Sequence, residues 1–154
     1  PMAAEVSGRR LLDQTSVVLP ETVDQMGWLI GDTGFEMSLS PEVPTLIGNA
    51  LPGTTTTFLK KHGLDRGQIT DWAVHPGGPR ILSTVEQSLQ LDADALQISR
   101  KVLSQYGNMS SATIFFILET LFFQAGQTSP PNQPDTCIAM AFGPGLTTEL
   151  ALFQ

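Results

Sequence analysis

Two apolar segments at the end of the chain restrict the fold more than any other feature of the sequence. Residues 136–142 and 146–153 have the apolar content and the length of β-strands, and only Gly143, Pro144 and Gly145 separate them. Parallel strands need a crossover of about a dozen residues or more, so this link is too short to join a parallel pair. The sequence therefore predicts that the chain ends in an antiparallel hairpin.

Strand and helix patterns alternate along the rest of the chain. Short β-branched or alternating runs indicate strands, and apolar residues at helical spacing indicate helices. The predicted strands cover residues 15–19, 35–39 and 72–74, and the predicted helices cover residues 40–62, 79–89, 92–103 and 109–123. Alternation of this kind, closed by a hairpin, predicts an α/β fold with a mixed sheet covered by helices. The length of 154 residues fits a single domain, residues 1–154.

Four details of these elements are specific enough to be checked against a structure. The strand at residues 35–39 alternates apolar and polar side chains, so it should be half-buried. Pro52 should kink or break the first helix, and Asp92 or Asp94 should cap the third. The helix at residues 109–123 is apolar around its whole axis, which predicts burial on most sides.

The composition excludes several kinds of partner. The chain has 8 basic and 15 acidic residues and a net charge of −7, so it offers no basic surface for nucleic acid. A single cysteine excludes an internal disulfide and a multi-thiolate metal site, and we expect no metal. The longest apolar run, residues 114–123, contains Glu119 and is shorter than the roughly 20 residues of a membrane span. Without a secretory segment at its start, the sequence predicts a cytoplasmic protein.

His75 is the first candidate for chemistry. It follows the predicted strand at residues 72–74 and precedes Gly77 and Gly78, which lead into a helix. Binding sites in α/β sheets gather at the carboxyl ends of strands, and a helix start offers free N–H groups to an anion or a developing oxyanion. A structural histidine that caps the turn explains the position equally well, so both interpretations remain open.

Asn108 is the second candidate, because it precedes the most apolar helix of the chain. Its amide could act as an N-cap, or it could donate a hydrogen bond to an oxyanion in a pocket. Ser110 and Ser111 could line the same pocket or satisfy the first helical turn. Cys137, in contrast, lies within an apolar strand with no helix start behind it to lower its pKa, so we expect an unreactive buried thiol.

Residues 75–79, 106–112 and 142–146 match the motifs of one known family in both order and spacing. They resemble the C-terminal motifs of the chalcone/stilbene synthase-like family of type III polyketide synthases, and residues 26–28 are most similar to bacterial members. The resemblance implies the C-terminal half of a thiolase-like fold. A ketoacyl-ACP synthase III-like enzyme is the alternative, but its motifs lack the double glycine after the histidine.

The resemblance implies an acyltransferase that condenses acyl-CoA starters with malonyl-CoA by decarboxylative Claisen condensation. It implies no cofactor, since the coenzyme A thioesters are substrates. His75 and Asn108 match the two catalytic positions that this half of the family contributes. Two preorganised N–H donors there would stabilise the negative charge that decarboxylation places on the thioester oxygen.

The resemblance also implies binding positions. Gly77, Gly78 and Arg80 match part of the coenzyme A entrance, although Arg80 fits a solvated helix position equally well. Met37 matches a gatekeeper position of the cavity, where a flexible thioether would leave an adaptable space. The residues assigned to the substrate cavity are Met37, Ser110 and Phe142.

Nothing in the chain matches the nucleophile motif or the N-terminal half of the family. Since the sequence also begins with Pro1 rather than methionine, we expect a fragment that needs a missing N-terminal half and is inactive alone. Its uncovered apolar face should favour self-association or a homodimer. The alternative is a non-catalytic binding or scaffold domain derived from the same fold.

Overall fold

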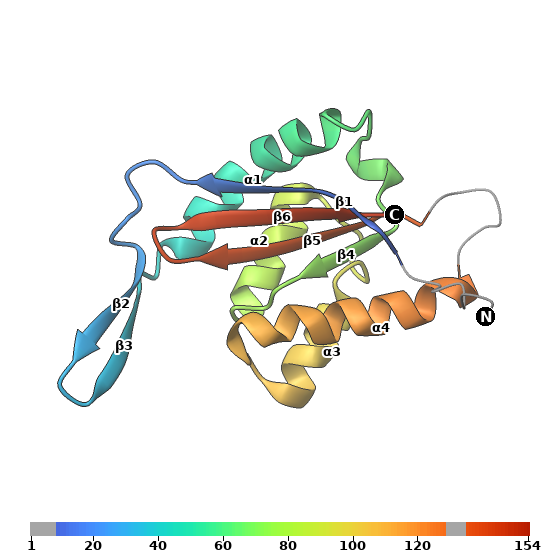
Figure 1. Cartoon of the computed structure of the whole chain (residues 1–154). Coiled ribbons are helices and arrows are strands. Elements are labelled where there is room, and N and C mark those ends of the chain that lie inside the picture. The colour runs from blue at the N-terminus through green and yellow to red at the C-terminus, as the bar shows by residue number, and fades with distance from the viewer. Residues whose placement is uncertain (1–8, 129–134) are drawn as a thin grey trace, which may run out of the picture.

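A four-stranded mixed sheet forms the centre of the molecule (Figure 1). The computed structural model describes residues 9–128 and 135–154. The outer antiparallel strand β1 pairs with β6, β6 pairs antiparallel with β5, and β5 pairs parallel with β4. In that order the strands are β1 (Leu11–Val18), β6 (Thr147–Phe153), β5 (Cys137–Gly143) and β4 (Asp71–Val74). The predicted mixed sheet and final antiparallel hairpin are confirmed.

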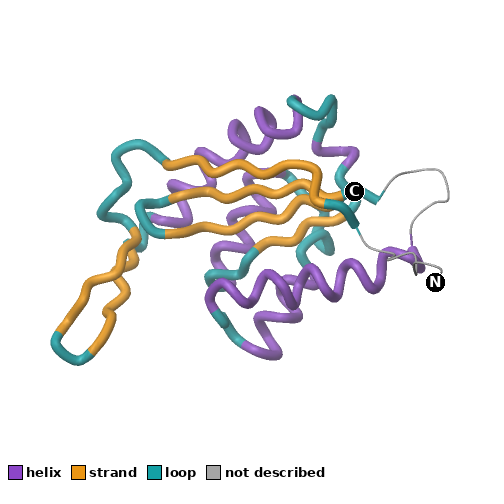
Figure 2. The backbone as a smooth tube through the Cα atoms, viewed as in Figure 1, coloured by secondary structure: helices purple, strands orange, loops and turns teal. Residues whose placement is uncertain are grey.

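Helices cover both faces of this sheet, as Figure 2 shows. One buried cluster joins the sheet to the first two helices, and a second joins it to the last two. The helices are α1 (Val43–Lys60), α2 (Pro79–Leu89), α3 (Gln97–Tyr106) and α4 (Thr113–Thr128), with short 3₁₀ turns η1 (Arg66–Gln68) and η2 (Ser110–Ala112). The predicted α/β class is therefore confirmed.

Strand β4 illustrates why this part of the sequence forms a central strand. Trp72 and Val74 point into the cluster under α1 and α2, whereas Ala73 between them points into the cluster under α3 and α4. All three side chains are buried. Successive side chains of a strand point to opposite faces, so a run without polar residues fits a strand that is covered on both sides.

A second hairpin, β2 (Met26–Gly31) with β3 (Gly34–Leu39), projects from the end of the sheet (Figure 1). All six residues of β3 are exposed, so the prediction of a half-buried strand at residues 35–39 is wrong. The alternation exists in the sequence, yet no element of the described chain covers either face. Phe35 is 72% exposed and Met37 is 54% exposed.

Helix α1 continues through Pro52, and the predicted break at that residue is absent. A proline in a helix interior removes one backbone hydrogen bond and costs about 3 kcal/mol. Leu51 and Phe58, on either side of the proline, are each only 1% exposed. Full burial of two such side chains contributes roughly 1.5–3 kcal/mol each, which is enough to keep the helix continuous.

Helix α3 begins at Gln97, and neither Asp92 nor Asp94 caps it with a side chain. The predicted cap is wrong because a turn at residues 93–96, which includes Asp94, precedes the helix and makes Leu96 its N-cap residue. Leu96, the residue before α3, is completely buried. Burial of this leucine, rather than a polar cap, therefore fixes where the helix starts.

Helix α4 buries only the side that packs on the sheet. Thr113, Ile117 and Leu121 lie one helical turn apart and are at most 8% exposed. Phe115 and Phe123 lie on other sides and are 68% and 78% exposed. The prediction that this helix is buried on most sides is wrong for the described chain, because nothing in it covers the outward aromatic residues.

Candidate functional site

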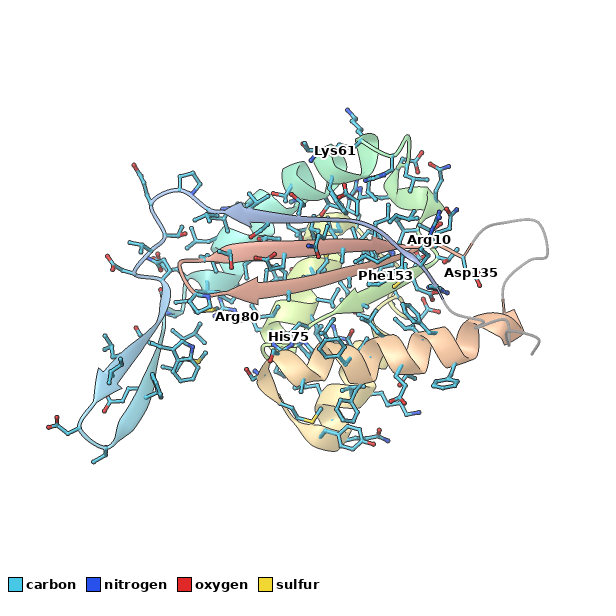
Figure 3. All side chains as sticks on the ribbon, in the orientation of Figure 1. Arg10, Lys61, His75, Arg80, Asp135 and Phe153 are labelled. Carbon is cyan, nitrogen blue, oxygen red and sulfur yellow. The ribbon has the colours of Figure 1, made fainter. Side chains whose placement is uncertain are left out.

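The carboxyl ends of β4 and β5 form the edge at which the candidate residues meet. His75 directly follows β4, and its backbone N–H donates a hydrogen bond of 2.8 Å to the carbonyl oxygen of Met140 on β5. Phe142 lies two residues further along β5, half-buried against the cluster under α1 and α2. Figure 3 labels His75 at this end of the sheet. Its position agrees with the general location of sites in α/β folds.

The His75 imidazole is neither fully buried nor free in water. Burial lowers its pKa below the ordinary value of 6.5, because removal from water disfavours the charged ring. The ring is therefore neutral at pH 7. A neutral imidazole keeps one N–H that can donate a hydrogen bond to an oxyanion.

Asn108 lies in the loop between α3 and η2 and reaches the same edge of the sheet. Its Nδ2 donates a hydrogen bond of 3.3 Å to the carbonyl oxygen of Gly77, and its Oδ1 accepts one of 2.9 Å from the N–H of Ser110. The structure thus brings the His75 and Asn108 tracts together. The Oδ1 contact is of the capping kind, whereas Nδ2 carries a second hydrogen that the Gly77 contact does not use.

The loop that carries Asn108 has an unusual backbone. Gly107 and Ser110 both have positive φ angles, 71° and 57°. The left-handed region costs a residue other than glycine about 1–2 kcal/mol, so Ser110 is held in a strained conformation. Its side chain is exposed, which is compatible with the predicted cavity position and equally with the start of η2.

Gly77 and Gly78 leave open space over the start of α2. A Cβ atom on Gly78 would meet no atom within 4 Å, and one on Gly77 would lie 3.5 Å from the Ile81 side chain. The packing of the described chain therefore does not require glycine at these positions. No side chain caps α2, and Pro79 has no N–H. The N–H groups of Ile81 and Leu82 bond the carbonyl oxygen of Gly78, so the Arg80 N–H is the donor that this turn could offer to an anionic group.

Arg80 lies in the first turn of α2 and is exposed (Figure 3). Within the described residues its side chain has no hydrogen bond or ion pair. It lines a groove of about 560 Å³ between α1 and α2, together with Thr45, Asn49 and Ser88. Both interpretations from the sequence, a ligand contact and a solvated cation, agree with this position.

The gatekeeper candidate Met37 lies on the projecting hairpin and pairs with Trp28 across the two strands. Cross-strand partners share a face, so Trp28 flanks the same space as Met37. Trp28 also makes an edge-to-face contact with Phe35, with ring centroids 6.4 Å apart. Sequence reasoning missed Trp28, although an antiparallel pairing of residues 26–31 with the following strand would have indicated it.

A short set of hydrogen bonds joins this hairpin to the end of the sheet. The N–H of Gly145, in the turn between β5 and β6, donates to the carbonyl oxygen of Met26 at 2.9 Å. The hydroxyl of Thr22 lies 3.3 Å from the carbonyl oxygen of the same glycine. The turn predicted from the sequence therefore anchors the hairpin beside the strand that carries Phe142.

Cys137 does not belong to this site. It lies at the opposite, amino-terminal end of β5 and is completely buried. Burial raises the pKa of its thiol to about 12, so the thiolate is scarce near neutral pH.

Among the described residues no group of three His, Cys, Asp or Glu side chains could hold a metal ion. No helix in this part of the chain combines the length and the apolar character needed to cross a membrane.

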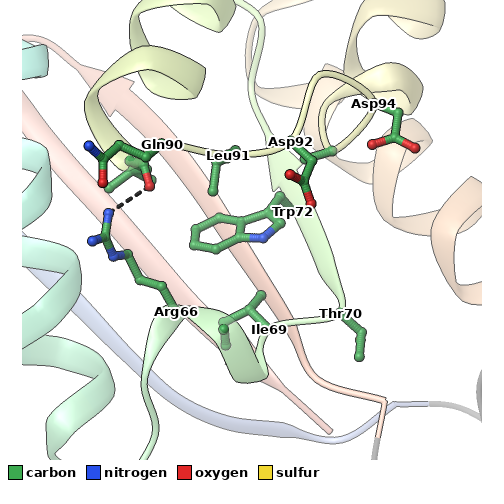
Figure 4. A pocket seen from close by; sticks show the side chains of 11 residues that line it. Arg66, Ile69, Thr70, Trp72, Gln90, Leu91, Asp92 and Asp94 are labelled. Carbon is green, nitrogen blue, oxygen red and sulfur yellow. Dashed lines mark hydrogen bonds between the residues drawn. The ribbon is translucent and has the colours of Figure 1, made fainter.

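Another pocket, of about 390 Å³, lies at the amino-terminal end of β4 (Figure 4). Trp72 forms its floor, and Asp92 and Asp94 stand at its rim. The Arg66 guanidinium closes one side through a hydrogen bond of 2.6 Å to the carbonyl oxygen of Leu89. None of the candidate site residues lines this pocket, so it is separate from the His75 edge.

Comparisons with known proteins identify the family of the chain. Residues 10–154 match the family model described as the C-terminal domain of chalcone and stilbene synthases. A putative chalcone synthase of Bacillus subtilis is 33% identical over 94% of this chain and 39% of its own length. Type III polyketide synthase 21 of Oryza sativa is 37% identical over 97% of this chain and 38% of its own length. The chain thus spans about two fifths of the length of these curated relatives.

The fold is shared with a solved structure of the same kind. PKS-I from the brown alga Ectocarpus siliculosus superposes with a TM-score of 0.88 and is 31% identical. The match covers 95% of this chain and 39% of the algal protein. The match to the chalcone and stilbene synthase model confirms the resemblance derived from the three sequence tracts. The chain belongs to the chalcone and stilbene synthase family and corresponds to its C-terminal domain.

Proposed function

We propose that this chain supplies the oxyanion-stabilising half of a type III polyketide synthase active site. The observation that supports the proposal is the hydrogen bond from Asn108 Nδ2 to the carbonyl oxygen of Gly77, two residues after His75. It joins the loop that carries Asn108 to the backbone just after His75, at the carboxyl end of β4 and the start of α2. Two N–H donors aimed at one developing charge are the arrangement that such catalysis needs.

The proposed reaction is a decarboxylative Claisen condensation. Malonyl-CoA loses carbon dioxide, and the electron pair of the broken C–C bond passes to the thioester carbonyl, which becomes an enolate. His75 and Asn108 donate hydrogen bonds to the enolate oxygen. The enolate carbon then attacks a starter acyl thioester, a new C–C bond forms, and the thiolate of that thioester leaves. The neutral state of His75 suits this role, since it can donate without first being protonated.

The remaining assignments follow the same proposal. The open space over Gly77 and Gly78 and the nearby Arg80 would receive part of coenzyme A. Met37, Ser110 and Phe142 would line the substrate cavity, to which we add Trp28 because it pairs with Met37. We also propose a cytoplasmic location, where coenzyme A thioesters are available. The nucleophile must come from another part of the enzyme, because the Cys137 thiol is buried and protonated.

The test uses an assembled enzyme, here meaning this chain fused after the N-terminal part of the Bacillus subtilis relative. Radiolabelled malonyl-CoA should release carbon dioxide with the assembled enzyme, and acyl-CoA should label it stably. The isolated chain should do neither. The N-terminal part alone is the control for activity that does not depend on this chain. Stable acylation of the isolated chain at Cys137, or a soluble fusion no more active than the N-terminal part, would contradict the proposal.

The outward aromatic residues of α4 give a prediction about the isolated chain. Phe115 and Phe123 are 68% and 78% exposed, and an uncovered apolar surface of this kind favours association. We expect the isolated chain to self-associate and the double variant Phe115→Gln, Phe123→Gln to sediment as a smaller species. Its unfolding free energy should change by only about 0.5 kcal/mol, because the side chains make little contact in the monomer.

Analytical ultracentrifugation over a concentration series measures this difference. Val18→Gln is a matched control, since Val18 is 62% exposed and ends β1, at the sheet edge opposite the strands that α4 contacts. It should leave the association unchanged. An isolated chain that is monomeric at every concentration, or a double variant that associates as strongly as the original chain, would show that these aromatics are not the cause.

A further inference from the structure

Two buried hydroxyl groups hold the backbone on either side of the candidate site. The Ser99 hydroxyl of α3 accepts a hydrogen bond of 3.2 Å from the N–H of Val74, the residue before His75. The Thr113 hydroxyl of α4 accepts one of 2.8 Å from the N–H of Met109, the residue after Asn108. Both side chains are completely buried. Each proposed catalytic residue therefore has one neighbouring peptide group fixed by a helix.

The Ser99 contact compensates for the edge position of β4. This strand is four residues long and has a partner, β5, on only one side. The N–H of His75 points toward β5, where it bonds Met140, so the preceding N–H of Val74 points away from the sheet. Ser99 replaces the missing strand at this N–H. Without the hydroxyl, a buried N–H next to His75 would lose its partner.

The Thr113 contact closes the loop that presents Asn108. The bond joins Met109 to the first residue of α4 and spans the 3₁₀ turn η2 between them. Within this span Ser110 has a φ of 57°, a strained value that a flexible loop would relax. The Thr113 hydroxyl thus helps to maintain the conformation in which Asn108 reaches Gly77.

We infer that Ser99 and Thr113 are positioning residues, whose hydroxyls hold the peptides beside His75 and Asn108 so that the two donors converge. The inference rests on the proposed function for its catalytic meaning. Neither hydroxyl is proposed to touch the substrate, since both are buried under the helices that carry them. Their effect on chemistry is exerted through His75 and Asn108.

Nuclear magnetic resonance of the chain itself tests the positioning. The chain has only two histidines, so a His62→Gln background leaves a single imidazole signal for His75. Ser99→Ala should accelerate exchange of the Val74 N–H by about tenfold or more and shift the His75 signal. Thr113→Val should do the same for the Met109 N–H and shift the Asn108 amide signals. Ser99→Thr and Thr113→Ser keep the hydroxyl, so they should restore the original exchange rates and the original His75 and Asn108 signals.

Thr70→Val is the matched control for a general loss of stability. Thr70 lies just before β4, at its other end, where its hydroxyl accepts from the N–H of Thr136 at 3.0 Å and donates to the carbonyl oxygen of Thr136 at 2.8 Å. Both this variant and Ser99→Ala should lower the unfolding midpoint by about 2–4 °C, but Thr70→Val should not alter the His75 signal. Equal His75 shifts in Thr70→Val and Ser99→Ala would overturn the inference. So would unchanged exchange at Val74 and Met109.

Turnover by the assembled enzyme separates this inference from the proposed function. Ser99→Ala and Thr113→Val should lower kcat about tenfold while KM stays the same, because alignment of the donors is lost and not substrate binding. If the resonance signals move but kcat does not, positioning has no catalytic role and the inference fails. The proposed function would still stand in that case, provided that His75→Ala is inactive.

Discussion

Replacement of His75 by alanine should lower the rate of malonyl-CoA decarboxylation by the assembled enzyme about 10²–10³-fold. The enolate oxygen becomes negative as carbon dioxide leaves, and loss of one preorganised donor in such a site typically costs this much. The neutral imidazole suits the role because burial lowers the pKa of His75 below 6.5. Release of labelled carbon dioxide under saturating malonyl-CoA measures the effect directly.

His62 is the matched control, since it is the only other histidine of the chain. Its Nε2 lies 3.0 Å from the carboxylate of Asp13 on β1, which is at the opposite edge of the sheet from β4 and His75. His62→Ala should therefore leave decarboxylation unchanged, even if the fold is slightly less stable. A His75→Ala enzyme with close to full activity would refute the role assigned to this residue.

Replacement of Asn108 by alanine should also lower decarboxylation about 10²–10³-fold, for the same electrostatic reason. The structure shows that Asn108 has a second, structural contact, because its Oδ1 accepts the N–H of Ser110. Asn108→Asp separates the two effects, since a carboxylate can still accept that hydrogen bond but cannot donate to the enolate. We expect the aspartate variant to be as inactive as the alanine variant, with a loop closer to the original.

Gln14→Ala serves as the control, because Gln14 carries an exposed amide on β1, at the sheet edge opposite β4. Its carbon dioxide release should match that of the original enzyme. If Asn108→Asp retained activity while Asn108→Ala lost it, the residue would act through capping alone. Since both donors act on one oxygen, the double variant His75→Ala, Asn108→Ala should lose less than the product of the single losses.

The local features of the fold could be predicted from the sequence. Residues 72–74 are apolar because both faces of β4 are covered, and the turn at residues 143–145 is too short for any other pairing. The predictions that were wrong concern the burial of side chains and the points where helices begin or break, because both depend on packing against neighbouring elements. Residues 35–39 alternate and α4 is apolar on several sides, yet the described chain contains nothing to cover them.

The candidate site could be predicted only in part. His75 and Asn108 were identified from motifs, and the structure brings their tracts together through Gly77. Ser99 and Thr113 could not be found in this way, because a serine or threonine on a helix shows its role only when the folded backbone presents an unpaired N–H to it. Trp28 likewise depends on the strand register that pairs it with Met37.

The projecting hairpin of β2 and β3 has a consequence for how such a domain can diversify. All six residues of β3 are exposed, and within the described chain the strand pairs only with β2. Substitutions there alter few contacts of the folded domain, so its thermal stability should hardly change with them. If the hairpin lines the substrate cavity as proposed, selection on product size can act on it while selection on folding acts on the sheet and helices. Variants of this domain with different hairpin sequences should therefore unfold at nearly the same temperature, even where their hairpin side chains differ widely.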